Sequence, residues 1–232
     1  MRRVQIAPSL LSADFARLAE VVRQCEAAGA DVLHLDVMDG HFVPNLTFGS
    51  LVVEAIRPHT QLPLDCHLML AHPERYLAAF AEAGADWISV HVEACVHLHR
   101  TLQEIHSLGK RAGVVLNPLT PLEYAYEAAP YCDFILLMSV NPGFAGQEFI
   151  PGTLRRIEQL REFLDREGLA HVDIEVDGGI HAGNVAEIVR AGATIIVSAS
   201  GLFRGELSTN LRRMREAIAA ATLEHSSALP RS

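Results

Sequence analysis

Short apolar segments alternate with amphipathic segments along the whole chain. The apolar segments are rich in β-branched residues and five to eight residues long, which is typical of buried parallel strands. Between them, segments such as DFARLAEVVRQCEAAG (14–29) and PGTLRRIEQLREFLDREG (151–168) carry apolar residues at helical spacing. The predicted strands are residues 4–10, 32–38, 62–69, 87–92, 111–117, 132–139, 172–176 and 194–199.

A short glycine motif recurs where a helix-like segment meets an apolar one. AGAD occupies 28–31 and again 83–86, and AGAT occupies 191–194. Each glycine falls where the last turn of a helix needs a left-handed residue, and each motif precedes a predicted strand. The spacings between the copies are close to two and four units of about 28 residues, which indicates a repeated helix–strand unit.

Eight such units fit the 232-residue chain, at about 29 residues each. The pattern therefore predicts an α/β protein with one domain, a (β/α)8 TIM barrel covering residues 1–222, and a flexible C-terminal tail at 223–232. An open doubly wound sheet is the alternative. It is disfavoured because no G-x-G-x-x-G follows the first predicted strand and no topological switch point is visible.

Composition narrows the classes of partner. The formal net charge of -9 argues against a nucleic-acid or anionic-membrane surface, because phosphate backbones are held mainly by clustered Lys and Arg. No charge-free stretch reaches the roughly 18 residues of a membrane helix. The four cysteines are widely spaced and read as small core residues in a reducing compartment, so a cytoplasmic protein is expected.

Polar residues that can bind a metal fall at the ends of predicted strands. In LHLDVMDGHFVPNLTFG (33–49), His34 and Asp36 face one side of a strand because side chains alternate. His67 lies near the end of the third predicted strand and Asp177 directly follows the seventh, at the carboxyl edge where barrel active sites form. Two histidines and two carboxylates suit Zn²⁺, Mn²⁺ or Fe²⁺ better than Mg²⁺ or Ca²⁺. The histidines of HVEACVHLHR (91–100) are expected to diverge, although His91 could touch the pocket.

Two further sets of residues lie at the same edge. Met38, Met69 and Met138 each lie near the end of a predicted strand, either as core packing or as an apolar floor that excludes water from a reactive intermediate. Glycine-rich or small-residue loops at 141–149 and 177–180 and a third at 198–201 enter helices. Their backbone N–H groups predict a phosphate cradle.

The motifs IAPSLLSADF, LHLDVMDGHFVPNLTFG, DCHLM, NPGFAGQ and EVDGGI span nearly the whole chain. Together they resemble the ribulose-phosphate 3-epimerase family, whose members are (β/α)8 enzymes of the pentose phosphate pathway and the Calvin cycle. The resemblance implies that His34, Asp36, His67 and Asp177 bind one divalent ion (Zn²⁺, Fe²⁺, Mn²⁺ or Co²⁺), without an organic cofactor. It also implies that Asp36 and Asp177 are the catalytic acid/base pair, and a homo-oligomer is expected.

The implied reaction interconverts D-ribulose 5-phosphate and D-xylulose 5-phosphate at C3 by two-base proton transfer through a metal-stabilised enediolate. Asp36 is expected to accept the proton in one direction and Asp177 to donate one. The resemblance also implies a set of substrate-binding residues: Ser9, His67, Gly143, Phe144, Ala145, Gly146, Asp177, Gly178, Gly179, Ala199 and Ser200.

Two positions depart from the family pattern, since Ala145 and Ala199 stand where glycine is usual. A methyl group there could crowd the phosphate or disturb a turn with positive φ. Three other functions stay open: 3-epimerisation of a ketohexose 6-phosphate such as allulose 6-phosphate, a hexulose-phosphate synthase-like aldolase or decarboxylase reaction, and binding without catalysis.

Overall fold

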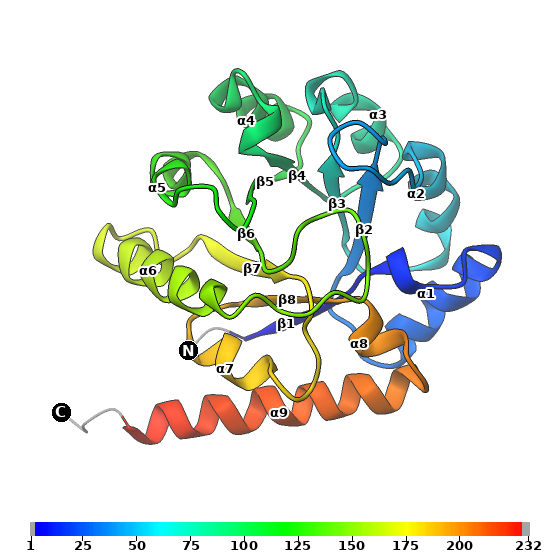
Figure 1. Cartoon of the computed structure of the whole chain (residues 1–232). Coiled ribbons are helices and arrows are strands. Elements are labelled where there is room, and N and C mark those ends of the chain that lie inside the picture. The colour runs from blue at the N-terminus through cyan, green and yellow to red at the C-terminus, as the bar shows by residue number, and fades with distance from the viewer. Residues whose placement is uncertain (1–2, 229–232) are drawn as a thin grey trace.

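The structure is a computed structural model that describes residues 3–228. Eight parallel strands form a ring, and the helices lie around its outside (Figure 1). The strands are β1 Gln5–Pro8, β2 Leu33–Met38, β3 Leu64–Met69, β4 Trp87–His91, β5 Arg111–Leu116, β6 Phe134–Met138, β7 Asp173–Asp177 and β8 Ile195–Ser198. All eight predicted strands are present, with ends displaced by a residue or two.

The helices follow the strands in regular alternation. The α-helices are α1 Leu18–Ala27, α2 Ser50–Ile56, α3 Leu77–Glu82, α4 Leu98–Ser107, α5 Glu123–Ala128, α6 Gly152–Arg166, α7 Val185–Arg190, α8 Ser200–Phe203 and α9 Leu207–Ala228. Short 3-10 helices are η1 Leu10–Ser12, η2 Phe15–Arg17, η3 Arg57–His59, η4 Pro73–Arg75, η5 Val92–Ala94 and η6 Ala129–Tyr131.

The strand ladder runs in the order β1-β8-β7-β6-β5-β4-β3-β2, and every pairing in it is parallel. Among the described residues, only the seam between β1 and β2 lacks a ladder. An isolated parallel bridge between Ser9 and His34, together with the Asp31 N–H to Ile6 carbonyl bond of 3.0 Å, joins that seam. The prediction of a (β/α)8 barrel with one domain is confirmed.

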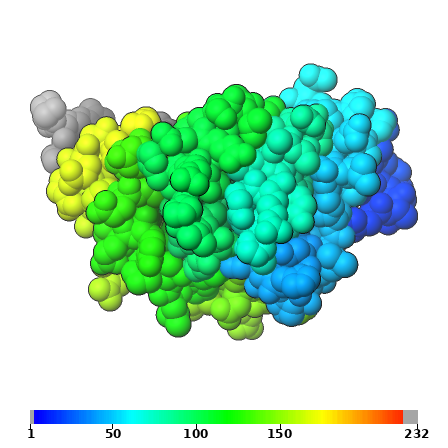
Figure 2. Space-filling view, turned by 90° about the horizontal axis from the view of Figure 1, so that it is seen from above, coloured from blue at the N-terminus to red at the C-terminus, as the bar shows by residue number. Residues whose placement is uncertain are grey.

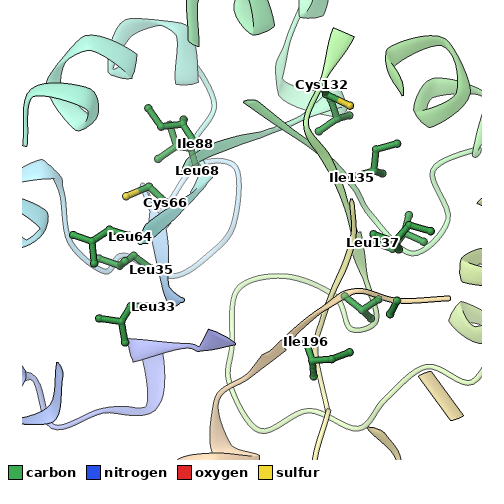
Figure 3. Packing of buried hydrophobic residues seen from close by; sticks show 14 of the residues in the cluster. Leu33, Leu35, Leu64, Cys66, Leu68, Ile88, Cys132, Ile135, Leu137 and Ile196 are labelled. Carbon is green, nitrogen blue, oxygen red and sulfur yellow. The ribbon is translucent and has the colours of Figure 1, made fainter. Parts of the chain in front are cut away.

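Alternation along each strand separates two environments. Leu33 and Leu35 of β2 point outward, as do Leu64 and Cys66 of β3, and Figure 3 shows such side chains between the strands and the surrounding helices. Burying a side chain of this size contributes about 1.5–3 kcal/mol each. The side chains between them in sequence point into the ring, so the polar residues of β2 and β3 share its interior with a few apolar ones.

The repeated glycine motif has the predicted backbone. Gly84 has a φ of 105°, in the left-handed region, and a Cβ there would lie 2.7 Å from the Arg57 side chain. Gly29 and Gly192 also have positive φ, at 87° and 119°. A residue other than glycine would be strained at these turns, so each motif ends one helix and directs the chain into the next strand.

The outer wall is continuous on the flank that carries α3, α4 and α5 (Figure 2). Helix α9 packs against α7 and continues to Ala228, so the part of the predicted tail from 223 to 228 is helical, and residues 229–232 lie outside the described residues. Within residues 3–228, no helix is both long and apolar enough to cross a membrane.

Candidate active site

The predicted metal ligands meet inside the carboxyl end of the barrel. His34 and Asp36 come from β2, His67 from β3 and Asp177 from the last position of β7. One ligand atom from each side chain lies within 4.8 Å of those of the other three. The two histidines and Asp36 are buried, and Asp177 is partly exposed to the pocket.

The hydrogen bonds of His34 leave one ring nitrogen free for a ligand. Nδ1 lies 2.7 Å from Oδ2 of Asp65 and 3.4 Å from Oε1 of Glu175, so this nitrogen carries the ring proton. Nε2 is buried without a hydrogen-bond partner and lies 3.4 Å from Oδ1 of Asp36. In the neutral form of His34, the Nε2 lone pair points to where the other three side chains converge. Without a metal ion, Asp36 and Asp65 outweigh burial and raise the pKa of His34 well above its usual range.

The charge of the site also fits a cation. Four carboxyl groups, from Asp36, Asp65, Glu175 and Asp177, surround His34, and no lysine or arginine of the described chain lines the pocket. Carboxylates buried at this density require a compensating positive charge. The nitrogen and oxygen donors are those that Zn²⁺, Mn²⁺, Co²⁺ and Fe²⁺ accept. The residues therefore fit the divalent ion that the resemblance implies.

Asp65 and Glu175 were not among the predicted site residues. Both are fully buried below the site, and together with His34 they form a second group of possible ligand atoms within 4.8 Å. Burial, followed by the charge of Asp65, raises the pKa of Glu175 well above its usual range. Strand alternation was the available signal, because Asp65 lies two residues before His67 and Glu175 two before Asp177.

The two predicted catalytic carboxyl groups differ in proton affinity. Burial opposes ionisation of Asp36, but the adjacent His34 outweighs it and holds the pKa of Asp36 well below the usual range. Burial, and then the charge of Asp36, raises the pKa of Asp177 to about 7. Ser9 adds to this difference, since its Oγ donates a 2.5 Å hydrogen bond to Oδ2 of Asp36. One group is thus ionised at neutral pH while the other can still hold a proton, as an acid/base pair requires.

The three predicted phosphate loops line the same pocket as the carboxylates. The residues that line this pocket include Asp36 and Asp177. The segment after β6 crosses the mouth of the barrel toward the loop after β2, where Asn45 Nδ2 donates to the Gly143 carbonyl at 3.0 Å (Figure 1). The predicted substrate-binding residues on its wall are Gly143, Phe144, Ala145, Gly146, Asp177, Gly178, Gly179, Ala199 and Ser200.

Neither Ala145 nor Ala199 lies in the left-handed region that favours glycine. Within the described residues no residue other than glycine has a positive φ, and Ala199 lies at φ -96°. The left-handed turns fall on neighbouring glycines, including Gly146 at 78° and Gly179 at 65°. The methyl groups of Ala145 and Ala199 therefore alter the pocket wall without straining its turns.

Sequence reasoning also missed a cation beside this cradle. Arg204 directly follows α8, and one of its guanidinium nitrogens lies 3.2 Å from where a Cβ on Gly146 would be. Arg204 lines a second hollow together with Gly146, Gly179 and Ser200, which also line the main pocket. No basic residue occurs within the loops themselves, so only the packing of α8 reveals this neighbour.

His91 and the three methionines also reach the site. The Nε2 atoms of His91 and His67 lie 2.8 Å apart, and the two rings stack at 5.0 Å between centroids. Met38, Met69 and Met138 are buried and line the pocket beside the carboxylates.

A parallel barrel with convergent histidines and carboxylates beside glycine-rich loops is typical of a TIM-barrel enzyme with a small-molecule substrate. The model of the "Ribulose-phosphate 3 epimerase family" matches residues 5–203. The chain belongs to the ribulose-phosphate 3-epimerase family and is an enzyme of that family.

Curated relatives with the same family name are similar to this chain in sequence over most of their length. "Ribulose-phosphate 3-epimerase" of Synechocystis sp. is 55% identical over 204 residues, covering 87% of this chain and 88% of the relative. The protein of the same name from Bacillus subtilis is 51% identical over 200 residues, covering 86% and 92%. The Escherichia coli protein of that name is 49% identical over 204 residues, covering 88% and 90%.

Solved structures of lower identity share the architecture. KGPDC from Streptococcus mutans superposes with a TM-score of 0.69 at 13% identity, covering 95% of this chain and 99% of its own. The 3-hexulose-6-phosphate synthase from Salmonella typhimurium superposes with a TM-score of 0.66 at 18% identity, covering 94% and 99%. At such identities the similarity concerns the fold alone.

Proposed function

We propose that the protein interconverts D-ribulose 5-phosphate and D-xylulose 5-phosphate by a metal-dependent, two-base epimerisation at C3. The observation that carries this proposal is the meeting of Asp36 and Asp177 in one pocket, with opposite shifts in pKa. The names of the curated relatives support the choice of substrate.

Inversion of a carbon beside a ketone requires one group to remove a proton from one face and another to return a proton to the opposite face. Asp36 belongs to β2 and Asp177 to β7, with β1 and β8 between these strands, so the two carboxyl groups approach a bound ketose from different sides. Asp36, held ionised, accepts the C3 proton. Asp177, with its raised pKa, donates a proton to the other face of the enediolate, and the roles exchange in the reverse direction.

His34, Asp36, His67 and Asp177 would hold the divalent ion. Such an ion supplies a Lewis acid that stabilises negative charge on the ketose oxygens during proton transfer. The chain's own contribution is orientation: Asp65 holds the His34 ring through Nδ1, and Ser9 holds the Asp36 carboxylate through Oδ2. Met38, Met69 and Met138 keep water from the reacting carbon.

The phosphate of the substrate belongs in the glycine-rich cradle. Backbone N–H groups of the loops after β6, β7 and β8 supply donors, and the guanidinium of Arg204 adds positive charge at the rim. Binding the phosphate here fixes the sugar so that its ketone end lies toward Asp36 and Asp177.

The decisive experiment measures kcat/KM for D-ribulose 5-phosphate and for allulose 6-phosphate in parallel, together with release of formaldehyde from hexulose 6-phosphate. A preference for the pentose phosphate and no formaldehyde are the expected results. A higher kcat/KM for the hexose phosphate would assign the alternative substrate, and formaldehyde release would assign an aldolase reaction.

A further inference from the structure

A chain of three side chains leads from the proposed ligand His67 away from the pocket. His67 Nε2 lies 2.8 Å from His91 Nε2, and His91 Nδ1 lies 3.2 Å from Oε2 of Glu93. Both histidines are fully buried, and the ring of Phe42 lies against His91 at 4.6 Å between centroids. Each of the two histidines thus has one ring nitrogen directed at His91 or His67 and the other directed at a carboxylate.

Glu93 is held as an acceptor of hydrogen bonds. Its Oε1 accepts the backbone N–H of Asn117 at 2.9 Å and the hydroxyl of Thr120. Burial opposes ionisation of Glu93, but its hydrogen bonds, led by the one from His91, outweigh burial and lower its pKa to about 2. An ionised carboxylate has no proton to give, so the proton between Glu93 and His91 belongs to Nδ1 of His91.

That assignment determines the state of the next ring. A neutral imidazole with its proton on Nδ1 has an acceptor at Nε2, so His91 accepts from His67 and the His67 proton lies on Nε2. The Nδ1 atom of His67 then presents a lone pair. This atom lies 3.2 Å from Oδ1 of Asp36, on the side where the four proposed ligands converge.

The opposite arrangement is the competitor. A proton on His67 Nδ1 would be donated to Asp36, and this tautomer would leave no lone pair for a metal ion. Beside Asp36, that tautomer would be the favoured one if His67 had no other partner. It would require His91 to donate from Nε2 and to carry a lone pair on Nδ1. This lone pair would face the carboxylate of Glu93, which is unfavourable, so Glu93 disfavours that tautomer.

We propose that Glu93, acting through His91, holds His67 in the tautomer whose Nδ1 can bind the metal ion. Glu93 is a positioning residue, since it touches neither the substrate pocket nor the metal ligands. This inference rests on the proposed function insofar as His67 is a metal ligand. It adds that the affinity for metal is controlled from the loop after β5, which holds Glu93 through Asn117 and Thr120.

Glu93→Gln tests the proposal while keeping the shape of the side chain. The Asn117 N–H can only donate, so the glutamine oxygen stays on that side and the amide NH₂ faces His91. His91 must then accept at Nδ1 and donate from Nε2, and the His67 proton moves to Nδ1. We expect the dissociation constant for Zn²⁺, measured by competition with a chromogenic chelator, to rise about 10- to 100-fold.

Two matched variants separate this effect from loss of charge or shape. Glu104→Gln removes the same charge from the exposed face of α4, and its dissociation constant for Zn²⁺ should equal that of the unmodified protein. Glu93→Asp keeps a group that can only accept, so it should retain a larger part of the affinity than Glu93→Gln. Equal Zn²⁺ affinities of Glu93→Gln and Glu104→Gln would overturn the proposal.

The tautomers are also read directly in the metal-free protein. Long-range ¹H–¹⁵N spectra of the unmodified protein should show the proton on Nδ1 of His91 and on Nε2 of His67. A proton on Nδ1 of His67 would overturn the inference, even if Glu93→Gln failed to fold. Both measurements are made without substrate, so they do not depend on the proposed epimerase activity. If the unmodified protein and Glu93→Gln bind Zn²⁺ equally tightly, the role of Glu93 is disproved and the proposed function is unaffected.

Discussion

Asp36 and Asp177 share one pocket, yet Asp36 has a pKa well below its usual range and Asp177 a pKa raised to about 7. The cause of the difference is their surroundings: His34 and His67 lie against Asp36, whereas Asp177 lies near the negative charge of Asp36. Two identical side chains are thereby suited to opposite tasks, one as base and the other as acid.

Asp177→Asn should lower the rate of epimerisation by about 10² or more, because it removes the proton carrier from one face of the substrate. Asp36 remains, so the variant incubated in D₂O should still exchange the C3 proton of one epimer faster than it converts either epimer. NMR follows both events in one sample, with the metal content measured alongside. Interconversion by metal-loaded Asp177→Asn at nearly the unmodified rate would exclude Asp177 as the second base.

Removal of the divalent ion should abolish turnover, because His34, Asp36, His67 and Asp177 would hold the group that stabilises charge on the substrate. Adding back Zn²⁺, Mn²⁺, Co²⁺ or Fe²⁺ should restore it. The measurement pairs elemental analysis with an assay on D-ribulose 5-phosphate before and after chelation. Full activity in a preparation verified as free of metal would contradict the expectation.

Ala145→Gly and Ala199→Gly should change KM modestly and leave kcat similar, because the phosphate is remote from the reacting carbon. Ala199 has a negative φ of -96°, so no left-handed turn requires glycine there. Steady-state kinetics on both variants provide the check. A large fall in kcat for both would mean that these loops do not hold the phosphate.

Arg204→Gln should raise KM several-fold with little change in kcat, since a charged hydrogen bond to phosphate is worth about 1.5–3 kcal/mol at most and Arg204 is exposed. The ratio of the two KM values should shrink as salt is added, because exposed charges are screened. Arg190→Gln serves as the control for loss of a positive charge. Arg190 lies on α7 and lines neither the main pocket nor the second hollow that contains Arg204. An unchanged KM for Arg204→Gln at low salt would remove Arg204 from the phosphate site.

Glu93 makes the stability of the metal-free protein depend on acidity. Its pKa falls from the ordinary 4.5 to about 2 on folding, so its stabilising effect is complete above pH 4.5 and is lost as the pH falls through about 2. Glu93→Gln should therefore be less stable by about 1–2 kcal/mol at pH 7, after allowance for partial exposure, and this gap should narrow toward pH 3. Urea unfolding at several pH values measures it, and a gap independent of pH would contradict the assignment.

Local patterns in the sequence were enough to predict the barrel and the outline of the site. Period-two alternation in LHLDVM and DCHLM places His34, Asp36 and His67 on the inner face of their strands, whatever the neighbouring strands are. Helical spacing and the recurring glycines likewise act over a few residues, so eight helix–strand units were predictable from local pattern alone. Boundaries shifted by one or two residues, and α9 continued past residue 222, because helix ends depend on packing.

The partners of the buried polar groups depend on how the strands and loops pack in three dimensions. Asp65 meets His34 because β2 and β3 pair in the register that sets these two residues side by side, and no pattern within either strand specifies that register. The raised pKa of Asp177 and the contact between His91 and Glu93 depend in the same way on burial and on distances across elements. Electrostatic and hydrogen-bond energies change steeply over a few ångströms, and such distances exist only once the barrel has closed.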